Sequence, residues 1–304
     1  MNMIRKILQR IKSAFYVVEN LPQQLDEIKI NQGRILSLLN QKNTNAPLND
    51  YEFKVFSQWG EDGIIQHLIN SLEIKNKTFI EFGVEEFTES NCRFLMMKDN
   101  WRGFIVDGSL SHINSIKQSY FYWRYDLNAY HAFITKNNIN EILQHSGFAE
   151  DLGILSIDVD GNDWFILKAV SFYKPRILIC EYNDVFGKER AISVPYDPQF
   201  NRTQKHYSNL YFGASISGIT YLAEKKGYTL VGVNSNRNNA FFIRQDLVCD
   251  KVPKVDLEAI YEPSNIRESR DESGRLTHLA GDERLALLKG LPIWNVKTDA
   301  LELL

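Results

Sequence analysis

Apolar residues along the chain follow two repeating patterns, which predict where helices and strands lie. From Ile4 to Leu39 they recur in alternating steps of three and four, the spacing of a coiled-coil seam. The seam consists of Ile4, Ile7, Ile11, Ala14, Val18, Leu21, Leu25, Ile28, Ile35 and Leu39, with Gln32 at the remaining heptad position. Pro22 interrupts this run, and because an interior proline costs a helix about 3 kcal/mol, we expect a kink or two helices there.

The N-terminal helix has more than one predicted role. Its first turns carry basic residues followed by aromatic and apolar ones, namely Arg5, Lys6, Arg10, Lys12, Phe15, Tyr16 and Val17. A basic amphipathic helix with aromatic residues can lie on an anionic membrane, whereas heptad spacing favours self-association or packing on its own domain. The segment is too polar to span a bilayer. We expect residues 1–45 to join copies of the chain into a homo-oligomer, with peripheral membrane contact as the alternative.

The main domain, expected over residues 50–250, alternates short buried apolar runs with amphipathic ones. A linker from Gln41 to Asp50 precedes it. The predicted strands are 78–84, 103–107, 122–125, 154–157, 176–183, 228–234 and 240–244, and the predicted helices are 64–72, 90–98, 134–143, 164–170 and 214–226. This order predicts an α/β fold with a Rossmann-like, seven-stranded, mostly parallel sheet flanked by helices, whose last two strands form an antiparallel hairpin. Residues 251–304 are expected to be an extension that packs on or near the active site.

The fourth predicted strand ends in closely spaced carboxylates. Strand side chains alternate, so Asp158 and Asp160 are expected to point the same way with α-carbons roughly 6.6 Å apart. At an effective dielectric of about 20 the two charges repel by ~2.5 kcal/mol, so we expect a positive group nearby. Ligands of open α/β sheets bind at this edge. Alternatively, the aspartates cap the next helix, although Asn162 and Asp163 can also fill that role.

The first two predicted strands indicate the kind of cofactor. A carboxylate at the tip of the second strand, here Asp107, accepts hydrogen bonds from ribose hydroxyls. A dinucleotide also needs a glycine-rich turn, but the chain reads Gly83-Val-Glu-Glu-Phe-Thr-Glu89, and three glutamates would repel a diphosphate. S-adenosylmethionine has a ribose and an adenine, a positive sulfonium and no phosphate. The loop therefore favours S-adenosylmethionine over a nicotinamide dinucleotide.

Charge and cysteine content exclude some classes of protein. A net charge of -3 and a pI near 6.1 do not favour a nucleic-acid-binding protein, which usually carries a basic excess. Cys92, Cys180 and Cys249 lack CxxC spacing, so we expect neither a disulfide framework nor a zinc site. This usage suits the cytoplasm, or a peripheral place at the inner face of the membrane. Asn201-Arg202-Thr203 matches a glycosylation acceptor, a match that we expect to mean little without a signal peptide.

Several motifs resemble a known family. They are Ser57-Gln-Trp-Gly-Glu-Asp-Gly63, Glu81-Phe-Gly-Val84, Glu89-Ser-Asn91, Trp101-Arg-Gly103, Asp107-Gly-Ser109, Leu155-Ser-Ile-Asp-Val-Asp-Gly-Asn-Asp163, Glu181-Tyr-Asn183, Pro195-Tyr-Asp197, Tyr211-Phe-Gly-Ala-Ser215 and Asn239-Ala-Phe-Phe242. Together they look like a bacterial group of class I S-adenosylmethionine-dependent methyltransferases related to the FkbM-type sugar O-methyltransferases, which are associated with surface-glycan biosynthesis. The resemblance covers roughly residues 50–280, and the Asp-Val-Asp-Gly-Asn-Asp run is its most specific part.

The resemblance implies roles for individual residues. It implies that Glu81 and Gly83 line the methionine end of the cofactor, with Gln58 and Asn91 as neighbours, that Asp107, Gly108 and Ser109 hold the ribose, that Asp126 approaches the adenine, and that Asp158 and Asp160 border the transferred methyl group. The glycines usual after Gly83 are replaced by glutamates, which is a departure from the family pattern.

Two mechanisms are open for a sugar hydroxyl, which is a weak nucleophile. In the first, an aspartate or His206 takes the hydroxyl proton, although His206 can also be an ordinary surface residue. In the second, Mg²⁺ held by Asp160, Glu181 and Asn183 lowers the pKa of the hydroxyl, unless Glu181 pairs with an arginine instead. We expect substrate contacts from Tyr182, Tyr196, Arg267 and Arg270, the arginines gripping a phosphate or carboxylate or else forming a solvated face.

The expected substrate is a sugar nucleotide or a glycan, methylated on a hydroxyl. A second class of function is a catalytically inactive methyltransferase fold that serves as a binding or assembly module organised by its coiled coil. The altered glycine loop makes this alternative reasonable. Binding of S-adenosylhomocysteine separates the two, because a retained enzyme binds it and a scaffold does not.

Overall fold

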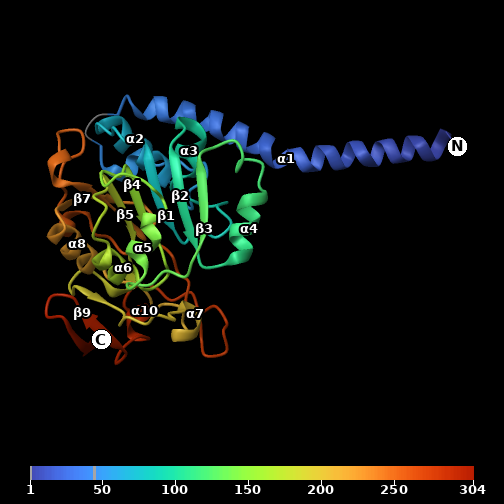
Figure 1. The fold of residues 1–304 in the computed structure, drawn as a ribbon. Coiled ribbons are helices and arrows are strands. Elements are labelled where there is room, and N and C mark those ends of the chain that lie inside the picture. Colours follow the sequence, from blue (N-terminus) through green and yellow to red (C-terminus); the bar gives the residue numbers. More distant parts are fainter. Residues whose placement is uncertain (1, 44–45) are drawn as a thin grey trace.

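A seven-stranded sheet forms the centre of the protein (Figure 1). The computed structural model describes residues 2–43 and 46–304. Its strands are β1 (Thr78–Phe82), β2 (Arg102–Asp107), β3 (Leu127–His131), β4 (Ile154–Ile157), β5 (Ile177–Glu181), β7 (Tyr228–Val233) and β8 (Asn239–Arg244). Their order is β3-β2-β1-β4-β5-β8-β7, and β8 runs antiparallel to both of its neighbours while the other pairs are parallel. The predicted α/β fold with its C-terminal hairpin is confirmed.

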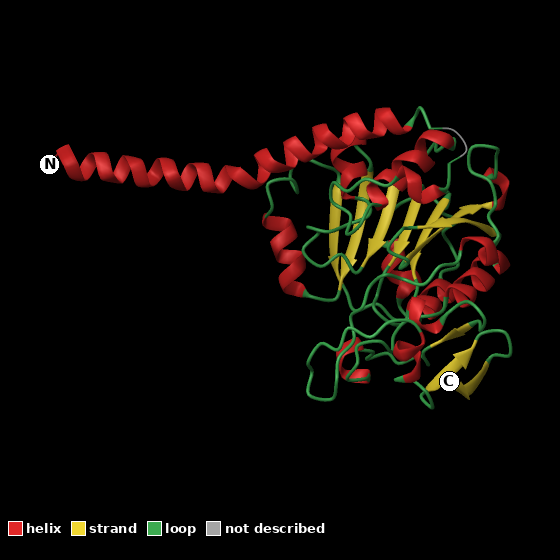
Figure 2. Ribbon diagram, turned by 180° about the vertical axis from the view of Figure 1, so that it is seen from behind, coloured by secondary structure: helices red, strands yellow, loops and turns green. Residues whose placement is uncertain are grey.

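Helices cover both faces of this sheet (Figure 2). One core contains residues of α2 (Glu61–Ser71), α3 (Arg93–Asp99) and α4 (Leu110–Gln118). The opposite core contains residues of α5 (Ile139–Gln144), α6 (Asp163–Ala169) and α8 (Ile216–Lys225). Successive strand residues divide between these cores: Phe79 belongs to the first and Ile80 to the second, as strand alternation requires. Burial on both faces explains why the central strands read as continuous apolar runs.

The strand order reverses between β1 and β4. From β1 the chain proceeds outward through β2 to β3, then returns to β4 on the other side of β1 and continues to β5. The connections that leave β1 and β4 therefore run in opposite directions and leave a crevice beyond the carboxyl ends of the two strands. This edge of the sheet is where the predicted site residues cluster.

The third strand differs from its prediction. Residues 122–125 form part of a turn, and β3 follows them as Leu127–His131. Aromatic residues in 122–125 favour a strand by propensity, but β3 lies at the edge of the sheet and has only alternating burial, so it lacks a continuous apolar signal. As a consequence, Asp126 comes before the strand and not at its tip.

The N-terminal helix α1 (Asn2–Asn40) is one continuous helix that contains Pro22. Figure 1 shows that its second part lies along the domain, and that it changes direction where it leaves the domain and projects away. The predicted division into two helices is therefore not seen. Asp26 anchors the docked part through Arg93, with 2.5 Å between the carboxylate oxygen and Nη2. The side chain of Ile4, and residues 44–45 of the predicted linker, lie outside the described part of the chain.

A small second sheet lies beyond the carboxyl edge of the main one and was not predicted (Figure 2). It contains β6 (Ile192–Ser193), β9 (Pro292–Asn295) and β10 (Ala300–Leu303). Three short helices lie in the segments that follow β6 or precede β9, namely α7 (Arg202–Lys205), α9 (Leu257–Ile260) and α10 (Asp282–Ala286). Val194, Leu288 and Ile293 contribute to its own apolar core. In residues 2–43 and 46–304, every helix is too short or too polar to cross a lipid bilayer.

Candidate functional site

A cavity of about 560 Å³ lies at the carboxyl ends of β1, β2, β4 and β5. Its inner wall consists of the strand tips, and its outer wall consists of residues from the segments that build the small sheet, such as Phe200 and Arg284. The predicted site residues that line it are Gln58, Glu81, Gly83, Asn91, Asp107, Gly108, Asp158, Asp160, Glu181, Tyr182 and Asn183. Most of the predicted residues are thus brought to one place by a fold in which parallel strands end at a common edge.

Gly83 allows β1 and β4 to come together at the bottom of the cavity. Its φ is +69°, a conformation that favours glycine. A Cβ atom at this position would lie 1.8 Å from the carbonyl oxygen of Asp158. The chain therefore turns out of β1 in direct contact with the end of β4, and only glycine fits.

Glu81 organises the loop that follows β1. Its buried carboxylate accepts hydrogen bonds from Ser90 Oγ at 2.6 Å and from the backbone N–H groups of Asn91 at 2.7 Å and Cys92 at 3.2 Å. Burial raises the pKa of Glu81 to about 7, against the opposing effect of these hydrogen bonds. Glu81 therefore fixes the cavity wall, and its oxygens are largely occupied by the chain itself.

Asp107 stands at the tip of β2 and faces the cavity. Its Oδ2 accepts from the backbone N–H of Glu85 at 2.8 Å and its Oδ1 from that of Ser109 at 2.7 Å. Oδ1 also lies 3.1 Å from Nδ1 of His112. A carboxylate oxygen can accept two hydrogen bonds, so Oδ2 retains capacity for a ligand hydroxyl. Gly108 lines the cavity beside it. Ser109 does not line the cavity; it caps α4 by accepting from the N–H of His112, and so holds Asp107 from behind.

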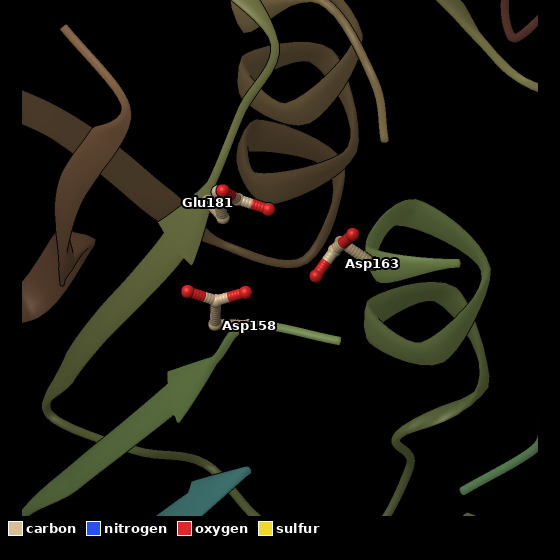
Figure 3. A group of neighbouring side chains, drawn as sticks. All are labelled: Asp158, Asp163 and Glu181. Atoms are coloured by element: carbon tan, nitrogen blue, oxygen red, sulfur yellow. The ribbon is translucent and has the colours of Figure 1, made fainter. Parts of the chain in front are cut away.

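Three carboxylates, those of Asp158, Asp163 and Glu181, converge where β4 and β5 end (Figure 3). One carboxylate oxygen from each of the three residues lies within 4.8 Å of the corresponding oxygens of the other two. Asp163 is held by the backbone N–H groups of Val159 at 2.8 Å and Gly161 at 3.0 Å, and burial raises its pKa to about 6. The cluster thus combines two acids from the ends of β4 and β5 with the first residue of α6.

The acids of this cluster retain protons more readily than ordinary carboxylic acids. Burial, then repulsion by neighbouring aspartates, raises the pKa of Asp158 well above its usual range, and burial followed by the charge of Asp158 does the same for Glu181. A hydrogen bond from Glu181 favours the charged form of Asp158. Two carboxyl groups so close together cannot both ionise easily, so the pair holds one proton between them.

Asp160 does not extend β4 as the alternation argument assumed. The strand ends at Ile157, and Asp160 has a left-handed conformation with φ of +54° in the turn before α6. Its side chain is exposed and lies 3.3 Å from Nη1 of Arg202. The predicted positive neighbour of the two aspartates is therefore Arg202, which reaches Asp160 and not Asp158.

The predicted metal-binding set of Asp160, Glu181 and Asn183 does not form. Asn183 is buried and its amide is held by the chain: Nδ2 donates to the carbonyl oxygens of Leu210 and Phe212 at 2.8 and 2.9 Å, and Oδ1 accepts from the N–H of Val185 at 3.0 Å. Asp160 is paired with Arg202. The neighbours of Glu181 are instead Asp158 and Asp163. The prediction failed because it assigned ligands by position along the strand without the contacts of the insert.

The polar segment before α2 serves two purposes. Gln58 and Trp59 line the cavity. Asp62, by contrast, is buried, and its Oδ2 accepts from the backbone N–H groups of residues 55, 56 and 57 at 2.7 to 2.8 Å. Glu61 binds Asn234 and Asn239 of the C-terminal hairpin through Oε1. The acids of this motif therefore hold the loop in place, and its amide and indole face the cavity.

Asp126 and His206 lie away from the cavity. Asp126 precedes β3, so it stands at the amino edge of the sheet, where it pairs with Arg102 at 2.5 Å; the predicted contact with an adenine is therefore wrong. His206 does not line the cavity. Its Nδ1 lies 2.7 Å from Ser208 Oγ, and its ring is next to that of Tyr207. A histidine in this position is not placed to act as the base.

Of the four predicted substrate residues, only Tyr182 lines the cavity. Tyr182 is buried in the cavity wall, whereas Tyr196 packs against Phe165 outside it. Arg267 is exposed, and Arg270 lies 3.6 Å from Glu268 and does not reach the cavity. The expectation that Arg267 and Arg270 grip a substrate anion at this cavity is therefore not met.

Sequence reasoning missed the outer wall of the cavity. Arg202 and Arg284 line it together with Phe200 and Phe212, and Arg237 lines the cavity from the turn between β7 and β8 of the main sheet. Arg202 falls inside the glycosylation-like match and Arg284 inside a short mixed run, so neither carries a local pattern that indicates a site. Only the pairing of segments far apart in sequence, such as Ser193 with Trp294, brings these residues to the strand tips.

Similarity to known proteins is limited to solved structures. No family model and no curated protein matches the chain. The structure is similar to that of an O-methyltransferase from Bacillus cereus in complex with SAH (12% identity, 71% of this chain and 89% of that chain, TM-score 0.40). It is also similar to a putative caffeoyl-CoA O-methyltransferase from Staphylococcus aureus (13%, 75% and 99%, 0.40).

A third similar structure is an O-methyltransferase family protein from Burkholderia thailandensis, with 9% identity over 61% of this chain and a TM-score of 0.39. The match spans 58% of that protein, which is less than two thirds of its length.

Proposed function

We propose that this chain is an S-adenosylmethionine-dependent methyltransferase that binds its cofactor in the 560 Å³ cavity and methylates a hydroxyl group of a sugar. The observation that carries the proposal is the position of Asp107, at the tip of β2, beside the point where the strand order reverses. A carboxylate there accepts hydrogen bonds from the hydroxyls of a ribose.

The residues around Asp107 suit this cofactor better than a dinucleotide. Glu85 and Glu89 line the cavity after β1, where a dinucleotide-binding fold presents glycine amides to a pyrophosphate. A cofactor with a sulfonium and an ammonium group and no phosphate is attracted by the same carboxylates. The cavity volume also lies in the range of roughly 300–1,000 Å³ that small-molecule sites occupy.

The acid cluster supplies a proton acceptor for the reaction. When bound, the cofactor supplies an electrophilic methyl group and leaves as S-adenosylhomocysteine. Asp158 accepts the proton of the acceptor hydroxyl on a carboxylate oxygen, while Glu181 holds Asp158 by a hydrogen bond. Phe200 and Phe212 cover the cavity from the outer wall and reduce the access of water.

The proposal includes a sugar as the acceptor and a proton transfer that uses no metal ion. The sequence motifs resemble sugar O-methyltransferases, and the polar wall residues Gln58, Asn91 and Asn238 offer hydrogen bonds to hydroxyl groups. Because the predicted Mg²⁺ ligands do not come together, the proposed proton transfer uses Asp158 and Glu181 alone. Turnover measured with added Mg²⁺ and with EDTA tests the predicted metal dependence.

Calorimetric titration with S-adenosylhomocysteine tests the proposal. We expect the wild type to bind, and Asp107→Asn to bind at least tenfold more weakly, because a hydrogen bond to a charged group contributes about 1.5–3 kcal/mol. Asp126→Asn is the matched control, because this exposed aspartate lies at the opposite edge of the sheet, and its affinity should be unchanged.

Release of S-adenosylhomocysteine from S-adenosylmethionine, measured with nucleotide sugars and free sugars as acceptors, tests the substrate class. A wild-type chain that binds no S-adenosylhomocysteine would favour the inactive assembly module instead. Equal loss of affinity in Asp107→Asn and Asp126→Asn would contradict the assigned position of the ribose.

A further inference from the structure

We propose that Arg284 binds an anionic group of the acceptor in the outer wall of the cavity, an inference that rests on the proposed function and names its substrate class. Arg284 belongs to α10 and is only 8% exposed. Its guanidinium donates no hydrogen bond to any residue in 2–43 or 46–304, and Nε is buried without a partner. The nearest carboxylate oxygen, from Asp184, lies 3.8 Å from Nη1, which is beyond hydrogen-bond distance.

The other buried arginines of the chain show what such a side chain normally has. Arg93 is 5% exposed and, although its Nε is also buried without a partner, its terminal nitrogens donate to Asp26 and to the carbonyl oxygen of Phe87. Arg176 is 9% exposed and donates to the carboxylate of Asp151 from two of its nitrogens. Buried charges are paired and hydrogen-bonded as a rule. Arg284 is the exception among the described buried arginines, and it lines the cavity.

The surroundings of Arg284 leave its positive charge incompletely balanced. Asp184 is engaged by Ser264, whose N–H donates to Oδ2 at 2.9 Å, and burial raises the pKa of Asp184. Burial lowers the pKa of Arg284, and the charge of Asp184 opposes this effect; of two other groups that line the cavity, Arg202 lowers the pKa further and Glu268 raises it. An anion between Arg202 and Arg284 would relieve this repulsion and supply the missing acceptors.

The chemistry of the guanidinium defines the class of ligand. Its parallel N–H groups match the oxygens of a carboxylate or a phosphate, which it binds in a bidentate manner. An acceptor with either group fits: a sugar linked to a nucleoside diphosphate, or a uronic acid. The neutral part of the sugar would then extend from α10 toward Asp158, which lines the same cavity.

Calorimetry of the full-length protein tests this assignment with inorganic pyrophosphate, glucuronate and neutral glucose as probes, each with and without S-adenosylhomocysteine. We expect the wild type to bind pyrophosphate or glucuronate and not glucose, and whichever anion binds identifies the phosphate or the carboxylate as the recognised group. In Arg284→Met that binding should weaken at least tenfold, while the affinity for S-adenosylhomocysteine changes less than twofold. Arg284→Lys keeps the charge and should lose less.

Arg267→Met is the matched control, because Arg267 is exposed in the same part of the chain. The assignment is overturned if the wild type binds neither anion, or if Arg284→Met and Arg267→Met behave alike. Far-ultraviolet circular dichroism confirms that each variant is folded, and Arg284→Lys decides the matter if Arg284→Met is not. Failure of S-adenosylhomocysteine binding alone refutes the proposed function, since the anion arms without it still report on Arg284.

A different observation carries a second inference, about helix α1. The helix docks on the domain through Asp26, Ile30, Gly33 and Ser37, which are all buried. The heptad seam lies on the opposite face and is exposed. Its described apolar members of appreciable size, Ile7, Ile11, Val18, Leu21, Leu25, Ile28, Ile35 and Leu39, are between 45% and 64% exposed. At 1.5 Å per residue, this seam runs for about 50 Å along both the docked and the free part.

We infer that α1 of a second copy of the chain covers this seam. A strict heptad repeat drifts by about 20° per heptad around a straight helix, so the seam rotates by about 80° between Ile7 and Ile35. A partner helix follows such a seam by supercoiling, whereas a flat lipid surface does not. Gln32, a single polar residue at a core position, is also a device by which coiled coils fix register and oligomeric state.

Light scattering on the size-separated, full-length protein tests this inference. The wild type should have at least twice the monomer mass, and the double variant Val18→Asp, Leu25→Asp should be a folded monomer, since both positions are exposed on the helix surface. Tyr16→Asp is the control, because Tyr16 is exposed on the same helix but off the seam. A monomeric wild type overturns the inference, including one that floats with phosphatidylglycerol vesicles.

Discussion

Substitution of Gly83 by alanine tests how closely the tips of β1 and β4 are joined. Two costs are expected. The left-handed backbone, with φ of +69°, costs a residue with a Cβ roughly 1–2 kcal/mol. The new Cβ would also lie 1.8 Å from the carbonyl oxygen of Asp158, so β1 or β4 has to shift. Forced overpacking of this kind costs about 1–3 kcal/mol more.

Gly147 provides a matched control for this substitution. Its φ of +64° is nearly the same, but no atom lies within 4 Å of a Cβ built there. Gly147→Ala therefore carries the backbone cost alone. The difference between the two variants isolates the contact with Asp158, which we expect to be about 2 kcal/mol in the free energy of unfolding.

Urea denaturation followed by circular dichroism measures both free energies, and calorimetry with S-adenosylhomocysteine measures the effect on the cavity. Because a shift of the Asp158 carbonyl displaces the acid cluster, we expect Gly83→Ala also to weaken cofactor binding and Gly147→Ala to leave it unchanged. Equal destabilisation by the two substitutions would refute the claim that the strand tips are in contact.

Three further predictions concern the buried charges. The pKa of Glu81 is raised from 4.5 to about 7, so the protonated form stabilises the fold fully below pH 4.5, and this stabilisation is lost as the pH rises to about 7. In urea titrations at several pH values, Glu81→Gln should remove up to about 3 kcal/mol of the pH dependence of the free energy of unfolding. The same pH dependence in the variant and the wild type would contradict this prediction. Asp26→Asn leaves Arg93 buried without its counter-charge and should destabilise by about 3–5 kcal/mol in the same assay, whereas Asp299→Asn in the exposed pair with Lys168 should cost less than about 1 kcal/mol. Asp158→Asn should lower kcat by about a hundredfold or more with S-adenosylhomocysteine affinity retained, and a variant with normal turnover would exclude Asp158 as the proton acceptor.

The central strands were predictable because burial on both faces gives them a local signature. The run Ile154–Ile157 is apolar and short, and its predicted ends coincide with those of β4. The edge strand β3 has no such run, since only alternate residues of Leu127–His131 are well buried. The strand was therefore predicted at the aromatic residues just before it, and Asp126 was assigned to the wrong edge of the sheet.

The inner wall of the site was predictable for a related reason. Asp107 is the last residue of β2 and Asp158 directly follows β4, so their position along the chain fixes their position in the fold. The outer wall depends on contacts between distant segments. Arg202 reaches Asp160 from 42 residues away, and Arg284 reaches Asp184 from α10. Contacts between such distant residues produce no periodic pattern in the sequence. Strands as short as β6, with two residues, are also too short to show an alternation of apolar and polar residues.

The division of the cavity between two parts of the chain has a consequence for how its specificity can change. Residues up to Asn183 form the wall around Asp107 and Arg237 comes from the β7–β8 turn of the same main sheet, whereas Arg202 and Arg284 come from later segments that fold around a separate small sheet. Substitutions or insertions in those later segments leave the seven-stranded scaffold intact. New acceptors can therefore arise by exchange of one wall, and a chimera that combines this scaffold with the outer segments of a relative is a direct way to alter which molecule is modified.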